Sequence, residues 1–88
     1  MPTIAQFYGI IISMYWRDHA PPHFHANYSG AKAVVRIEDG EVIAGSLPPN
    51  ARRIVREWAL ARQAELGQNW LRGDKRQPFL RIPGPDHE

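Results

Sequence analysis

The side chains best suited to chemistry are gathered in one short stretch near the N-terminus. Three of the four histidines, His19, His23 and His25, fall within seven residues, directly after Asp18. Imidazole takes up or releases a proton near neutral pH and also ligates metals, so this density of histidines favours a functional site. Asp18 could orient one of the rings through a hydrogen bond, as a carboxylate does in catalytic triads.

The residues around the histidines limit which of them can meet. The pair Pro21-Pro22 excludes regular helix and central strand, and its fixed φ values make the turn stiff. From His23 to Ser29 the sequence alternates as a strand does, which places the side chains of His23 and His25 on one face. His19 precedes the prolines and is therefore tied less firmly to that pair.

Four hypotheses fit these side chains. Metal-free cleavage of RNA needs a base, an acid and a cation, and His23 and His25 could act as base and acid. The positive charge would come from His19, Arg17 or Arg36. Alternatively, the three histidines would hold zinc, which often takes three protein ligands and a water. The turn could also be a contact surface without chemistry, or its histidines could simply satisfy backbone carbonyls.

A second group of cations lies in the C-terminal half. The first 50 residues carry three basic and four acidic side chains, whereas residues 51–88 carry eight basic and five acidic ones, a net charge of +3. Arginine forks onto phosphate oxygens, so Arg52, Arg53 and Arg56 could form a phosphate-binding helix face. The alternative is a solvated helix surface on which these arginines alternate with Glu57.

Composition narrows the class of protein. The chain has 88 residues and no cysteine, which excludes disulfides, thiolate metal sites and thiol catalysis. Its longest apolar run is too short to span a bilayer, and no secretion signal is visible. We therefore expect a cytoplasmic protein without membrane association. A single domain is predicted over residues 1–83, followed by a disordered tail over residues 84–88. A domain this small gains stability from association, so a partner protein or a homo-oligomer is also expected.

The elements that must position the histidines follow from the periodicity of the sequence. Residues 7–16 are rich in β-branched and aromatic side chains and predict one buried strand, after an extended lead-in over residues 1–6. Three further strands are predicted over residues 23–29, 31–38 and 41–46. The turn signal Asp39-Gly40 joins the last two as a hairpin, so the first half predicts an antiparallel meander.

The second half predicts one long helix, from about Asn50 to Leu71. Apolar residues recur there at helical spacing, and Trp70 continues the stripe beyond Gly67. Residues 79–82 could add a short edge strand. The fold class is therefore α+β: an antiparallel sheet of four to five strands packed against one long C-terminal helix, which covers the apolar face of the sheet.

Short motifs occur along nearly the whole chain. In order, they are Met1-Pro2-Thr3-Ile4, Phe7-Tyr8-Gly9-Ile10, Tyr15, Asp18-His19, Pro21-Pro22-His23-Phe24-His25-Ala26, Asp39-Gly40-Glu41-Val42, Gly45-Ser46-Leu47-Pro48, Glu57-Trp58 and Asn69-Trp70. In this combination, from Met1 to about Ile82, the sequence resembles a small bacterial family called domain of unknown function 4160. The proline–histidine stretch is the most specific part. The helix departs from the family, which often carries a more acidic stretch where this chain has residues 64–68.

The resemblance implies a context rather than a chemistry. Such proteins are often encoded beside another small protein, an arrangement like that of a toxin and its antitoxin. The preferred interpretation is a toxin-like or effector member of a two-protein module, which acts on or binds RNA and could be a metal-independent ribonuclease. A small cognate partner, encoded nearby, would cover the active surface.

In this interpretation two groups of residues carry the function, and no cofactor is needed. The catalytic group is Asp18, His19, His23 and His25. The group that binds nucleic acid is Arg17, Arg36, Arg52, Arg53 and Arg56. The alternative is a non-enzymatic binding module, which contacts a partner protein or DNA through the same turn and the arginine helix, with structural histidines.

Overall fold

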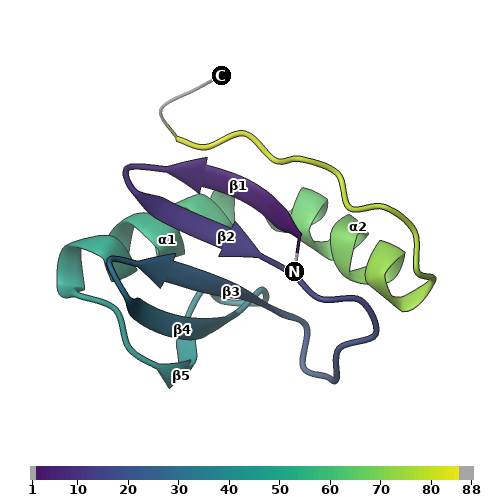
Figure 1. The fold of residues 1–88 in the computed structure, drawn as a ribbon, viewed down its shortest axis with the longest axis horizontal. Helices are drawn as coiled ribbons and strands as arrows, with labels where there is room; N and C mark the ends of the chain where they lie inside the picture. The colour runs from purple at the N-terminus through teal and green to yellow at the C-terminus, as the bar shows by residue number, and fades with distance from the viewer. Residues whose placement is uncertain (1, 86–88) are drawn as a thin grey trace.

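An antiparallel sheet followed by helices makes up the fold (Figure 1). The computed structural model describes residues 2–85. The five strands of the sheet are β1 (Thr3–Phe7), β2 (Ile10–Ser13), β3 (His23–Tyr28), β4 (Ala31–Arg36) and β5 (Val42–Gly45). They lie in the sheet in chain order and each pairs antiparallel with the next, so the predicted meander and the α+β class are confirmed. The two helices are α1 (Pro49–Ala61) and α2 (Gln63–Asp74).

The single strand predicted over residues 7–16 is wrong, because the chain reverses direction at Tyr8 and Gly9. Their φ angles are 50° and 76°, the positive values that a two-residue type I′ hairpin requires. Phe7 pairs directly with Ile10 across this turn. The segment expected to be a lead-in, residues 1–6, supplies most of β1. Apolar content is the same for one long strand as for two short ones, so composition did not reveal the turn.

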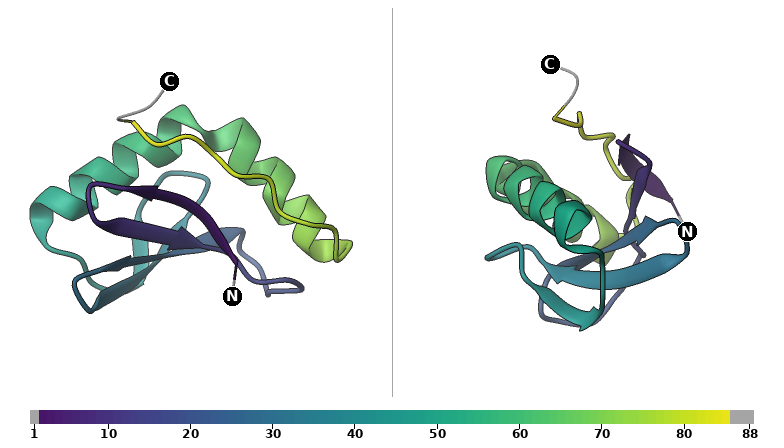
Figure 2. Two further views of the ribbon diagram at one scale, coloured as in Figure 1. Left: turned by 45° about the horizontal axis from the view of Figure 1, so that its top comes forward. Right: turned by 90° about the vertical axis from the view of Figure 1, so that its left-hand side faces the viewer.

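The single long helix is also wrong, because it is divided at Arg62. This residue has φ −117° and ψ 25°, outside the helical range, although its N–H still bonds to the carbonyls of Trp58 and Ala59. In Figure 2 the two helices form an arch over one face of the sheet. Gly67 lies inside α2. The apolar stripe runs through the bend, since a change of axis at one residue barely disturbs the local spacing of apolar positions.

The predicted edge strand over residues 79–82 does not form, although this segment runs beside β1. The N–H of Ile82 donates to the carbonyl of Ile4 over 2.8 Å. The side-chain amide of Asn69 is fully buried and makes two hydrogen bonds to the backbone of Leu80. Its Nδ2 donates to the carbonyl of Leu80 over 2.9 Å, and its Oδ1 accepts the N–H of Leu80 over 2.8 Å. Because a side chain satisfies this backbone, a strand ladder is not needed there.

The tail predicted as disordered, residues 84–88, is described only at its first two positions. Gly84 is buried there. The rest of that prediction lies outside the described residues. Neither of the two described helices is long and apolar enough to cross a membrane.

The core lies between the helices and one face of the sheet. Phe24 of β3 meets the ring of Trp58 edge-on, with centroids 5.7 Å apart, and Phe7 packs on the same ring at 5.0 Å. Ala26 is buried on the same face of the strand. Since neighbouring side chains of a strand point to opposite faces, His23 and His25 lie on the other face of β3. His25 borders solvent there, whereas His23, at the start of the strand, is covered by Trp70 of α2.

We expect Gly45→Ala to lower the free energy of unfolding by about 1–3 kcal/mol. The φ of Gly45 is 72°, and a β-carbon there would clash with the carbonyl oxygen of Lys32 on β4. Gly67→Ala is the matched control, because the space around Gly67 is open; this change should raise the free energy of unfolding by about 0.5–1 kcal/mol. Urea denaturation followed by tryptophan fluorescence measures both. Equal effects would contradict the close approach of β4 and β5.

Candidate functional site

The loop between β2 and β3 carries Asp18 and is tied to the C-terminal part of the chain. The N–H of Arg17 donates to the carbonyl of Gly73 over 3.1 Å. The indole N–H of Trp16 donates to the carbonyl of Gln77 over 2.8 Å. These bonds join residues more than 50 positions apart in the sequence, and they determine where Asp18 lies.

The carboxylate of Asp18 is the centre of the candidate site. Its Oδ1 accepts the backbone N–H of His19 over 2.9 Å, while its Oδ2 lies 2.8 Å from His23 Nε2 and 3.5 Å from His25 Nε2. Burial alone would raise the pKa of Asp18, but the hydrogen bond from His19 and the charge of His23 outweigh it, and the pKa lies below its ordinary value. Asp18 is therefore an ionised acceptor at neutral pH.

His23 is buried and is hydrogen-bonded at both ring nitrogens. Its side chain is only 4% exposed, and its ring lies 5.2 Å from that of Trp70 on α2. Nδ1 donates to the carbonyl of Pro21 over 2.7 Å, and Nε2 donates to Asp18. Because both partners are acceptors, the ring needs a proton on each nitrogen to form both bonds. His23 therefore holds the loop, the sheet and α2 together.

His25 belongs both to this cluster and to the surface. Its side chain is 32% exposed, and its ring meets that of Tyr15 edge-on with centroids 4.5 Å apart. Its Nε2 atom is buried and makes no hydrogen bond within the described residues. The 3.5 Å to Asp18 is longer than an ordinary hydrogen bond of this kind. A buried polar atom whose only polar contact is a long one is uncommon in a folded protein and needs an explanation.

His19 lies on the solvent side of the same carboxylate. Its Nδ1 is 3.2 Å from Asp18 Oδ1, and its ring centroid is 5.7 Å from that of His23. The side chain is 88% exposed. The structure thus places all three histidines around Asp18, but only His23 and His25 face its Oδ2 atom.

Next to His25, the face of the sheet that the helices leave uncovered forms a groove of about 310 Å³. Strand register explains its lining: Ser13 pairs with His25 and Asn27 with Lys32, all on the face away from the core. The polar lining residues are Thr3, Ser13, Tyr15, His25, Asn27 and Lys32, and the apolar ones are Ile11, Ala26, Ala33, Val34, Ala44 and Gly45. No acidic side chain is among them, so the groove suits a ligand that combines apolar faces with hydrogen-bond acceptors.

The arginines predicted on the helix are separated from the histidines. Arg52, Arg53 and Arg56 belong to α1, which lies over one face of the sheet (Figure 2). The groove is lined by residues of the opposite face, such as Ser13, His25 and Lys32. Arg53 pairs with Glu57 over 3.5 Å on its own helix. Arg56 similarly pairs with Glu41, over 2.9 Å. These arginines therefore cannot contact a ligand that lies beside His25.

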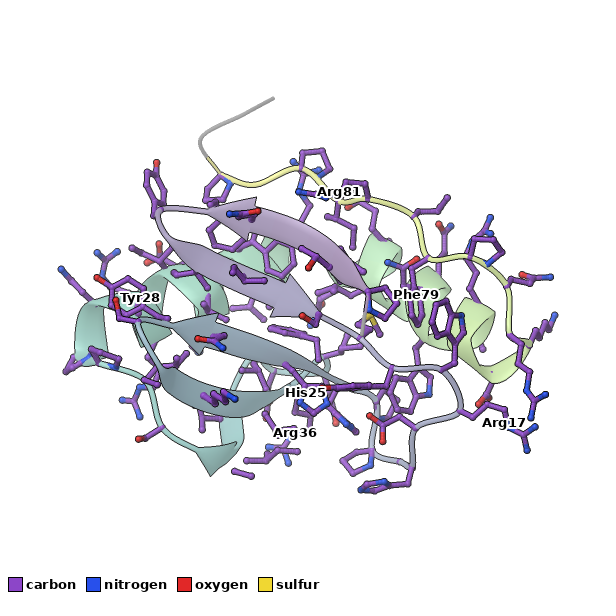
Figure 3. The ribbon with its side chains drawn as sticks, viewed as in Figure 1. Arg17, His25, Tyr28, Arg36, Phe79 and Arg81 are labelled. Atoms are coloured by element: carbon purple, nitrogen blue, oxygen red, sulfur yellow. The ribbon has the colours of Figure 1, made fainter. Side chains whose placement is uncertain are left out.

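The other two predicted arginines differ in position. Arg36 stands opposite His23 in the register of β3 and β4, but its guanidinium binds Asp39 over 2.6 Å and holds the pKa of that carboxyl below its ordinary value. Arg17 lies far from His25, near the end of α2 (Figure 3). Neither guanidinium joins the Asp18 cluster.

The strand alternation put Asn27 on the face of His23 and His25 without giving it a role, and sequence reasoning missed Lys32 and the groove itself. Alternation along two paired strands could have found them. Once His25 is placed on the outer face, the residue two positions along β3 must lie on that face too, and so must the residue that pairs with it on β4. What was absent was the register of the two strands, which sets Asn27 opposite Lys32.

We expect His23→Ala to lower the free energy of unfolding by about 2–4 kcal/mol, because it removes a buried ring with two hydrogen bonds and leaves Asp18 less well paired. The matched control is His19→Ala, which removes an exposed ring and should change stability by less than about 0.5 kcal/mol. Thermal and urea denaturation measure both variants. If His23→Ala were as stable as His19→Ala, the supporting role of His23 would be wrong.

Comparison with known proteins identifies a family but no activity. The family model described as Domain of unknown function (DUF4160) matches residues 9–71, which include Asp18 and the three histidines around it. Searches of curated proteins and of solved structures found no match.

Proposed function

The chain belongs to the DUF4160 family, and from this starting point we propose that it binds single-stranded RNA in the groove of its sheet. It would do so as the toxin-like or effector member of a small two-protein module. The observation that carries the proposal is the groove beside His25, which combines apolar surface, aromatic rings and hydrogen-bond donors without any acidic lining residue.

The arrangement of layers supports this choice of ligand. An antiparallel sheet with helices on one face and aromatic side chains on the other is a common platform for single-stranded RNA. Here Tyr15 and His25 offer ring edges and faces at one end of the groove, and Lys32 supplies a positive charge for a phosphate. Stacking of bases on aromatic rings supplies affinity, and the cation adds a salt-dependent term.

The chemistry of the bound RNA would fall to His25. It is the only one of the clustered histidines that lines the groove, whereas the ring of His23 is buried and engaged at both nitrogens. Cleavage of RNA by Asp18, His19, His23 and His25 stays a prediction. The geometry favours a division in which His23 anchors Asp18 within the fold, and His25, whose ring packs on that of His23, alone meets a substrate.

A second occupant of the groove is the partner protein of the module. Half of the lining residues are apolar, and Ile43 on β5 is 39% exposed. A partner that inserts apolar side chains into the groove would block access of RNA. This is how an inhibitory partner would silence an effector. RNA and partner would then compete for one surface.

We expect Lys32→Ala to weaken binding of a fluorescein-labelled, 12-nucleotide single-stranded RNA by roughly three- to tenfold, and to reduce the salt dependence of log K by about 0.7, the value for one phosphate contact on a single strand. The matched control is Arg53→Ala, which removes the same charge from α1, on the far side of the sheet. It should leave affinity and salt dependence nearly unchanged. Fluorescence anisotropy at several salt concentrations measures both.

Two results would contradict the RNA proposal. The first is an equal loss of affinity in Lys32→Ala and Arg53→Ala, which would indicate a non-specific effect of charge. The second has three parts: the wild-type protein does not bind RNA, it copurifies with the protein encoded beside it, and the substitution Ile11→Asp in the groove breaks that association. The partner protein would then be the natural occupant.

A further inference from the structure

Three ligand atoms from Asp18, His23 and His25 converge on one small volume. They are a carboxylate oxygen of Asp18 and one ring nitrogen from each histidine, and all lie within 4.8 Å of one another. We propose that this cluster binds a divalent transition-metal ion of the zinc, iron(II) or manganese class. The proposal does not require that the groove binds RNA, although His25 belongs both to the cluster and to the groove lining.

The spacing of these atoms is close to that of ligands on one metal ion. Nitrogen and oxygen ligands lie about 2.0–2.2 Å from zinc, so two neighbouring ligands on the same ion are roughly 3 Å apart. In this structure Asp18 Oδ2 lies 2.8 Å from His23 Nε2 and 3.5 Å from His25 Nε2. Two of the three pairs thus have nearly the spacing of ligands on one ion, and all three atoms lie within 4.8 Å of one another.

The hydrogen bonds around the cluster are those that support metal ligands. A ligating histidine usually donates its other ring N–H to a carbonyl or carboxylate, which sets its tautomer and its orientation. His23 Nδ1 makes such a bond to the carbonyl of Pro21 over 2.7 Å. Asp18 Oδ1 is held by the N–H of His19 over 2.9 Å, which leaves Oδ2 for the ion.

The buried ring nitrogen of His25 is the second observation. Its Nε2 is buried and makes no hydrogen bond within the part of the chain that the structure describes. An ion between His25 Nε2 and Asp18 Oδ2, which face each other, would supply the partner that this nitrogen lacks. An ion bound here would thus pair the buried nitrogen, and it would replace the proton that His23 Nε2 shares with Asp18.

The donor types select the class of metal. Two imidazoles and one carboxylate suit zinc, iron(II) and manganese, whereas magnesium and calcium prefer sites made entirely of oxygen ligands. Three protein ligands also leave coordination positions for water or a substrate. This ligand set differs from the one that the sequence suggested, since Asp18 takes the place of His19, whose ring faces Oδ1 on the solvent side.

The test uses metal-free protein, prepared with a chelator that is then removed, and titrates it with Zn²⁺ in a calorimeter and with Co²⁺ in an absorption spectrometer. We expect one ion per chain, a rise in melting temperature on adding Zn²⁺, and visible absorption bands from bound Co²⁺. His25→Ala should weaken Zn²⁺ binding at least tenfold. Its ring is partly exposed, so this variant should fold, and circular dichroism checks that it does.

His19→Ala is the matched control, because it removes a neighbouring, exposed histidine outside the ligand set. It should bind Zn²⁺ and Co²⁺ as the wild-type protein does. The proposal is overturned if the wild-type protein binds neither ion, or if His19→Ala loses as much affinity as a folded His25→Ala. RNA binding measured with and without the chelator separates this result from the fate of the RNA proposal.

Discussion

The hydrogen bond between His23 Nε2 and Asp18 Oδ2 is the interaction on which the rest of the candidate site depends. It joins the loop after β2 to the first residue of β3, at the point where His23 also meets Trp70 of α2. An ionised carboxylate with little contact to water is costly unless it is paired. Its partners are the backbone N–H of His19 in the loop and the rings of His23 and His25 on β3. The carboxylate therefore joins the loop to β3, and His23 extends this connection to α2 through Trp70.

Strand β3 can serve both the core and the site because its side chains alternate. Phe24 packs against Trp58 under the helices, while His25 points to the outer face and borders the groove. The arch of α1 and α2 covers one face of the sheet and leaves the other open. This division also explains why the arginines of α1 and the histidines of β3 are not one site, although both are suited to binding an anion.

Local patterns predicted what depends on local spacing. The shared face of His23 and His25 follows from two-residue alternation, and the meander follows from a turn signal between short apolar runs. The hairpin at Tyr8 was missed, because β-branched residues on both sides of a glycine fit one strand as well as two. The position of Asp18 was out of reach for another reason: it depends on bonds such as that of Arg17 to Gly73, between segments far apart in sequence. Lys32 was missed because its place opposite Asn27 is a matter of register.

The protons of the His23 ring, observed in nitrogen-15 NMR spectra, test the central pairing most directly. In the metal-free protein, the account predicts that ring N–H groups of His23 exchange slowly, at Nδ1 because it is bonded to the carbonyl of Pro21 and at Nε2 because it is bonded to Asp18. Addition of Zn²⁺ should remove the Nε2 signal and leave the Nδ1 signal. Ring protons of His23 that exchange as fast as those of the exposed His19 ring would contradict the account.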